Sequence, residues 1–165
     1  MNYADIKKYD TANAVGINTS VYFSGCKFNC NGCFNKIAQV FSYGKEYTKE
    51  IEDLIIEYVS DKNVKGLCLL GGEVFQQDLN KIYNLVKRVK FFTDKPIWVW
   101  SGYTWEQLIK DDFKLDILKY IDVLIDGRFE LDKKDLNLRF RGSSNQRIID
   151  VQKSLKQNKI IEFLY

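Results

Sequence analysis

Three of the chain's four cysteines, Cys26, Cys30 and Cys33, lie within the ten-residue segment SGCKFNCNGC. Thiolates this close together repel one another and react readily unless a metal binds them. A structural zinc site nearly always has four ligands, but the chain has no histidine. The fourth cysteine, Cys68, lies in the apolar run VKGLCLL and is expected to pack as a small hydrophobic side chain.

A 4Fe-4S cluster explains three clustered cysteines better than zinc does. Such a cluster usually takes one cysteine per iron, so three ligands leave one iron with a vacant position that could bind and activate a substrate. We therefore interpret Cys26, Cys30 and Cys33 as metal ligands and as catalytic residues. Two alternatives are a zinc-stabilised interaction module and a small electron-transfer protein, although the latter would normally ligate every iron.

The absence of histidine excludes several classes of enzyme. It removes Ser-His-Asp and Cys-His catalysis, the two-histidine zinc proteases and any imidazole base. Chemistry must then depend on thiolates, carboxylates, amines or a cofactor. The formal net charge is +3 and the lysines are spread among acidic residues, so we expect no nucleic-acid partner.

Length and composition are those of one globular domain, which we assign to residues 1–165. No apolar run approaches the roughly 18 residues that a membrane span needs. The N-terminal sequence MNYADIKKYD also lacks the apolar core of a signal peptide. We therefore expect a cytoplasmic protein with no membrane partner, in a compartment where thiols stay reduced and clustered cysteines favour metal binding.

Strand and helix patterns alternate along the chain. Apolar runs that end at small or polar residues predict strands at 15–23, 64–70, 96–100 and 121–125, with a last strand at 147–151. Helical spacing predicts a helix over 48–60 with Thr48 as N-cap, a second that Asp78 opens, and a third in which Thr104 and Gln107 form a capping box. The expected fold is α/β with mostly parallel strands, too few to close an eight-stranded barrel, hence an open partial (βα) barrel or twisted sheet.

Parallel α/β folds bind ligands outside the carboxyl ends of their strands. Here the predicted strands end at the cysteine segment and at GGE, SGY and DG, so these four segments should meet on one rim. Trp98 and Trp100 alternate on the third of these strands and are expected to fill the core.

The spacing C-x₃-C-x₂-C resembles the signature of the radical S-adenosylmethionine superfamily. Further segments resemble one of its families, the activating proteins of anaerobic ribonucleoside-triphosphate reductase, which install a glycyl radical. These segments are SGCKFNCNGCFNK, LLGGEVF, WVWSGYTWEQL, DVLIDGRFE and RGSSNQRIIDV. The resemblance implies a partial barrel of the radical S-adenosylmethionine type, and reductive cleavage of S-adenosylmethionine to methionine and a 5′-deoxyadenosyl radical.

The resemblance also assigns cofactor contacts next to the third cysteine. Gly32, Cys33 and Phe34 would lie against S-adenosylmethionine, with the ring of Phe34 near the adenine. Many members of the superfamily have an aromatic residue where this chain has Gly32, and the activating proteins share this departure.

Two other strand ends would contribute to the same cofactor site. Gly71 and Gly72 would let the backbone approach the ligand, and Glu73 would pair with its ammonium group. The family more often has a proline after this acidic residue, where this chain has Val74, and the two glycines also fit a plain tight turn. Ser101 would line the same cleft together with its neighbours.

Asp126, at the end of the fourth predicted strand, is either a second cofactor contact or a helix-start cap, and the cap is slightly favoured. The arginines of RFRGSSNQR would face a partner or solvent.

The implied partners are the large subunit of the reductase, whose glycine loop is the substrate, and an electron donor such as reduced flavodoxin. An open barrel leaves a radical exposed, and a docked protein would shield it. Activation of another glycyl-radical enzyme, or radical chemistry on a small molecule, is the alternative function within the superfamily.

Overall fold

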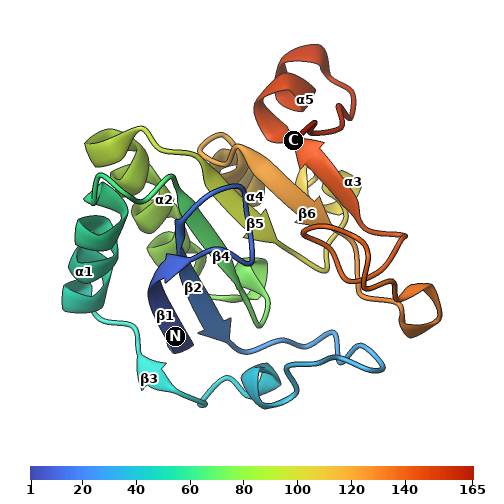
Figure 1. The fold of residues 1–165 in the computed structure, drawn as a ribbon, viewed down its shortest axis with the longest axis horizontal. Helices are drawn as coiled ribbons and strands as arrows, with labels where there is room; N and C mark the ends of the chain where they lie inside the picture. Colours follow the sequence, from blue (N-terminus) through green and yellow to red (C-terminus); the bar gives the residue numbers. More distant parts are fainter.

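Seven β-strands form one sheet in the computed structural model, which describes residues 1–165 (Figure 1). The strands are β1 Asn2–Asp10, β2 Asn18–Ser24, β3 Lys45–Glu46, β4 Leu67–Gly71, β5 Ile97–Trp100, β6 Val123–Asp126 and β7 Arg147–Asp150. They lie in the order β3-β1-β2-β4-β5-β6-β7. The central strands β2, β4, β5 and β6 are parallel, which confirms the predicted α/β class.

The outer strands differ from the simplest prediction. Pairing is antiparallel between β1 and β2, between β1 and β3, and between β6 and β7. The strand before the cysteines is not the first of the sheet, because β1 precedes it. The sequence of β1, NYADIKKYD, gives little signal because only Tyr3 and Asp10 are buried and most other positions are polar and partly exposed.

Five α-helices accompany the sheet: α1 Lys49–Ser60, α2 Leu79–Thr93, α3 Trp105–Leu108, α4 Asp112–Leu118 and α5 Val151–Gln157. The predicted N-caps are confirmed, since the side chains of Thr48 and Asp78 accept hydrogen bonds from backbone amides in the first turns of α1 and α2. At α3, the backbone N–H of Thr104 donates to Gln107 Oε1 at 2.9 Å. No helix has both the length and the apolar character needed to cross a membrane.

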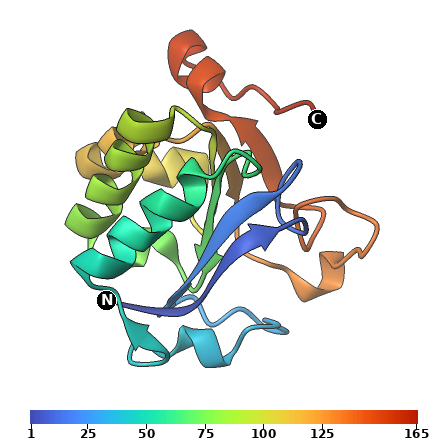
Figure 2. The same cartoon turned by 60° about the vertical axis from the view of Figure 1, so that its left-hand side comes forward.

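The main core lies between the sheet and the helices. Figure 2 shows α1, α2 and α4 on the same face of the sheet. Alternate strand residues point toward them, among them the fully buried Val21, Leu69, Val99 and Leu124. This layer of helices fixes the positions of the central strands, and therefore of the loops at their carboxyl ends.

The other face of the sheet carries a smaller core that includes Cys68 and Trp98, both buried as predicted. It is covered by non-helical segments of the chain. Phe140, between β6 and β7, and Phe163, in the C-terminal tail, pack edge-on against Trp98 with ring centroids 5.3 and 5.1 Å away. The indole N–H of Trp100 donates to the carbonyl of Phe140 at 2.6 Å. The chain itself therefore closes part of the face that lacks helices.

Candidate iron–sulfur site

The three predicted ligands lie on one loop that leaves the carboxyl end of β2 (Figure 1). Cys26, Cys30 and Cys33 are all partly buried. The loop turns tightly, because Asn29 and Gly32 have φ angles of +48° and +73°, and the N–H of Cys33 donates to the carbonyl of Cys30 at 3.2 Å. Asparagine and glycine are the residue types that adopt positive φ most readily. The loop is thus folded back on itself between the second and third cysteines.

Two thiols of this loop, those of Cys26 and Cys30, are poor at holding negative charge without a cation. Burial raises the pKa of Cys26, and a smaller rise comes from nearby Glu73 and Cys30. Burial and the proximity of Cys33 raise the pKa of Cys30. Bound iron would supply the compensating positive charge.

No three cysteine, aspartate or glutamate side chains lie close enough together to hold a single metal ion. A 4Fe-4S cluster takes one thiolate at each of several irons, so it does not require the ligands to converge on one point. Three partly buried thiols on one short loop therefore fit the donor chemistry of such a cluster.

The root of the cysteine loop rests on the carboxyl end of β4. Gly71 has φ of +107°, and a Cβ there would lie 2.6 Å from the backbone N and O of Phe23. A Cβ at Gly72 would lie 2.4 Å from the carbonyl oxygen of Gly25, which accepts a hydrogen bond from Glu73 N–H at 2.8 Å. The double glycine therefore permits close approach between two strand ends of the chain, whereas the sequence predicted close approach to a ligand.

Two adjacent glutamines hold the same loop, and sequence reasoning did not single them out. Gln76 Oε1 accepts the N–H of Lys27 at 2.7 Å. The buried Gln77 donates from Nε2 to the carbonyl of Gly25 at 3.0 Å. The only signal in the sequence is their place directly after the GGE segment.

Glu73 is buried, with only 1% of its surface exposed. Its Oε1 accepts the hydroxyl of Ser101 at 2.8 Å, and its Oε2 accepts the N–H of Gly102 at 2.7 Å. Burial raises the pKa of Glu73 to about 7, although these donors act in the opposite direction. The structure therefore joins the predicted residues Glu73 and Ser101 directly, and it links the carboxyl ends of β4 and β5.

Asp126 is also buried, and protein groups surround its carboxylate. Its Oδ2 accepts the N–H of Trp105, the first residue of α3, at 2.7 Å. Its Oδ1 accepts a hydrogen bond from Nε–H of Arg147 at 2.9 Å. Arg147 also forms an ion pair with Glu106. This geometry is a helix-capping contact between neighbouring strand ends, and a cofactor contact by Asp126 stays a prediction.

Gly32 and Phe34, predicted to lie against the cofactor, are exposed. A Cβ at Gly32 would lie 2.8 Å from Leu131, which follows β6, so the cysteine loop and the segment after β6 approach each other here. The ring of Phe34 is 94% exposed. Its predicted contact with an adenine ring stays a prediction.

The family follows from comparison with known proteins. Residues 12–149 match the model of the 4Fe-4S single cluster domain, a range that contains the whole cysteine loop. The chain is 41% identical over 150 residues to the anaerobic ribonucleoside-triphosphate reductase-activating proteins of Pasteurella multocida and Vibrio cholerae, and 37% identical to that of Escherichia coli K12. These matches span 88% of this chain and 95–96% of the relatives. The chain belongs to the family of anaerobic ribonucleoside-triphosphate reductase-activating proteins.

Membership of the activating-protein family confirms the resemblance found in the sequence. The family match also places the GGE, SGY and DG segments within the 4Fe-4S domain, because all three lie between residues 12 and 149.

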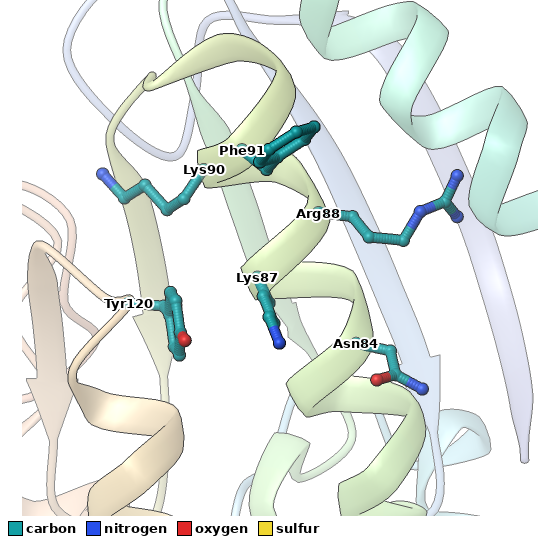
Figure 3. Close-up of a pocket in the computed structure, with 6 residues that line it drawn as sticks. All are labelled: Asn84, Lys87, Arg88, Lys90, Phe91 and Tyr120. Carbon is teal, nitrogen blue, oxygen red and sulfur yellow. The ribbon is translucent and has the colours of Figure 1, made fainter.

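A pocket of about 550 Å³ opens on the exposed side of α2 (Figure 3). Its lining contains no residue of the predicted site and consists of Asn84, Lys87, Arg88, Lys90, Phe91 and Tyr120. Two of its cations are already neutralised, since Arg88 pairs with Glu52 and Asp53, and Lys90 pairs with Asp122. The pocket therefore offers little free charge, and the cysteine loop is the better candidate for the reactive site of this activating-protein family member.

Proposed function

We propose that this chain is an oxidoreductase that activates an anaerobic ribonucleoside-triphosphate reductase by generating a glycyl radical on its large subunit. Its relatives are named for activating that reductase. The observation that carries the proposal is the loop of three partly buried thiols at the carboxyl end of a central parallel strand, within a matched 4Fe-4S domain.

In this proposal Cys26, Cys30 and Cys33 hold the cluster, and S-adenosylmethionine binds beside it. When bound and reduced by a donor such as flavodoxin, this pair supplies the 5′-deoxyadenosyl radical that removes a hydrogen atom from a glycine of the reductase. The chain's own part is to bind three irons, to orient the cofactor and to exclude water.

The neighbouring strand ends are suited to orienting the cofactor. Gly32 and Phe34 lie on either side of the third cysteine and are exposed, so both could contact the cofactor. Gly71 and Gly72 bring the end of β4 to the root of the cysteine loop, whose cysteines would hold the cluster.

Three polar side chains complete the proposed cofactor site. Glu73 accepts a hydrogen bond from Ser101 and lies buried beneath the rim, where its ionised carboxylate would attract an ammonium group. Asp126, at the end of β6, would contribute to the cofactor site only by holding the start of α3 and Arg147 in place, since both already bind its carboxylate.

The proposal also includes the finer features of fold and location. The parallel centre with helices on one face supports an open partial barrel of the radical S-adenosylmethionine type. A single continuous sheet supports one domain over residues 1–165. Free thiols at all four cysteines fit a reducing cytoplasm.

The test is anaerobic reconstitution followed by reaction with the reductase. Protein reconstituted with iron and sulfide, S-adenosylmethionine, a reductant and the reductase large subunit should give the electron paramagnetic resonance doublet of a glycyl radical. Changing Cys26, Cys30 or Cys33 to Ala should abolish both the cluster and the doublet.

Cys68→Ala is the matched control, because Cys68 is fully buried on β4 and burial raises its pKa to about 12. It should keep the cluster and the doublet and lose on the order of 1 kcal/mol of stability. Zinc without iron in the anaerobically purified protein, or loss of the cluster in Cys68→Ala, would contradict the proposal.

A further inference from the structure

Phe28, between the first two cysteines, packs onto the carboxyl ends of two other strands. Its ring meets that of Tyr103 edge-on, with ring centroids 4.7 Å apart and planes at 70°. The guanidinium carbon of Arg128 lies 4.3 Å from the centroid of the Phe28 ring. Tyr103 follows β5 and Arg128 follows β6. One side chain of the cysteine loop therefore contacts the ends of both β5 and β6.

Gly102 provides the space for this ring. A Cβ at Gly102 would lie 2.5 and 2.6 Å from Cδ2 and Cε2 of Phe28, distances that real Cβ contacts do not reach. The φ angle of Gly102 is outside the left-handed region, so its backbone does not require glycine. The absence of a side chain at Gly102 is thus explained by the ring of Phe28.

Arg128 is available to hold the ring because it forms no ion pair. A guanidinium over an aromatic face contributes about 0.5–1 kcal/mol at exposed sites. Arg128 therefore contacts the cysteine loop through the ring of Phe28.

We propose that Phe28 is a positioning residue: seated on Gly102 between Tyr103 and Arg128, it fixes the stretch from Cys26 to Cys30 relative to the ends of β5 and β6. This rests on the proposed function, in which those cysteines hold the cluster. The hydrogen bonds with Gln76 and Gln77, which follow β4, hold only the root of the loop, at Lys27 and Gly25. Beyond the root, the Phe28 contacts hold its middle.

The experiment is a double-mutant cycle on the ring and its seat. Phe28→Ala removes the ring, and Gly102→Ala adds a methyl group where the ring lies. After anaerobic reconstitution, each single variant should bind iron about 10–100-fold more weakly than wild type, the usual range for groups that orient metal ligands, and should lose it faster to a chelator. Each should also change the electron paramagnetic resonance spectrum of the reduced cluster.

The double variant distinguishes one shared contact between Phe28 and Gly102 from two separate effects on the loop. The double variant should be no worse than Phe28→Ala alone, because the added methyl group then has no ring to displace. Phe28→Leu keeps apolar volume without a ring and serves if Phe28→Ala fails to fold, with a smaller effect expected. Phe91→Ala, on the distant α2, is the control for loss of an exposed ring and should match wild type.

Wild-type chelation rates and spectra in Phe28→Ala, Phe28→Leu and Gly102→Ala would overturn the positioning role. Strictly additive losses in the double variant would overturn it as well. Either result leaves the proposed function intact as long as the cysteine variants lose the cluster. Failure of the wild-type chain to take up iron and sulfide would instead refute the proposed function.

Discussion

Glu73 shows how one side chain joins the parts of the site. Its carboxylate accepts hydrogen bonds from Ser101 and Gly102 on the next strand end and lies beneath the rim. Burial raises its pKa from the ordinary 4.5 to about 7. The folded state thus holds this proton more tightly than the unfolded chain does.

A pH dependence of stability follows from this raised pKa. The contribution of Glu73 is fully present below about pH 4.5 and is lost as the pH rises through about 7. We expect Glu73→Gln to remove this loss. The difference in free energy of unfolding between wild type and variant should therefore change by about 3 kcal/mol between acidic and mildly alkaline pH. Urea unfolding across that range measures it. A difference that is independent of pH would contradict the assignment.

Residue types and spacing were enough to predict the cysteine loop and the nearness of Glu73 to Ser101. They did not predict that Phe28 needs Gly102, because that contact joins positions far apart in the chain and depends on how two strands are placed side by side. The glycine of SGY therefore looked like part of a cofactor cleft, whereas the structure assigns its space to a side chain of the protein.

At the scale of elements, Arg147 connects the last strand to the helix after β5. It pairs with the buried Asp126 and with the exposed Glu106 of α3. The guanidinium of Arg147 lowers the pKa of Glu106 to about 2. One arginine on β7 thus joins β6 to α3.

Arg147→Leu should destabilise the fold on the order of 3 kcal/mol, because it leaves the buried carboxylate of Asp126 without its cation. Glu106→Gln is the matched control and should cost less than about 1 kcal/mol, since that pair is exposed to solvent. Chemical denaturation of both variants tests the difference. Equal losses in the two variants would show that burial of Asp126 is not the cause.

Helices α1, α2 and α3 and the central strands were predictable because apolar periodicity and N-cap residues are local signals, whereas the short helices α4 and α5 were not among the predicted elements. Thr48 and Asp78 begin α1 and α2 as the sequence predicted. The outer strands were harder, since β1 has few apolar residues and the direction of β7 depends on a long preceding loop. The packing on the face of the sheet without helices could not be predicted either. Phe140 and Phe163 contact Trp98 there from two segments that are far apart in the sequence.

At the scale of the molecule, apolar side chains are exposed around the cysteine loop. Phe34, Ile37 and Val40 lie within or just after the loop, and Leu131 touches it at Gly32. Exposed apolar groups gathered at a reactive site favour contact with a protein surface. Under the proposed function, that surface belongs to the reductase, whose glycine must reach the same rim.

Hydrogen exchange can locate this contact. With the reductase large subunit present, backbone amides of residues 26–41 should exchange several-fold more slowly, because the docked partner excludes water from the rim. The exposed Phe91 and Phe92 on α2 give an internal comparison, since they are equally apolar but lie beside the remote pocket of Figure 3. Slower exchange at the end of α2, with none at the cysteine loop, would place the reductase on the wrong face for hydrogen abstraction. Slower exchange at the loop alone would show that the open rim is closed by the partner, as shielding of a radical requires.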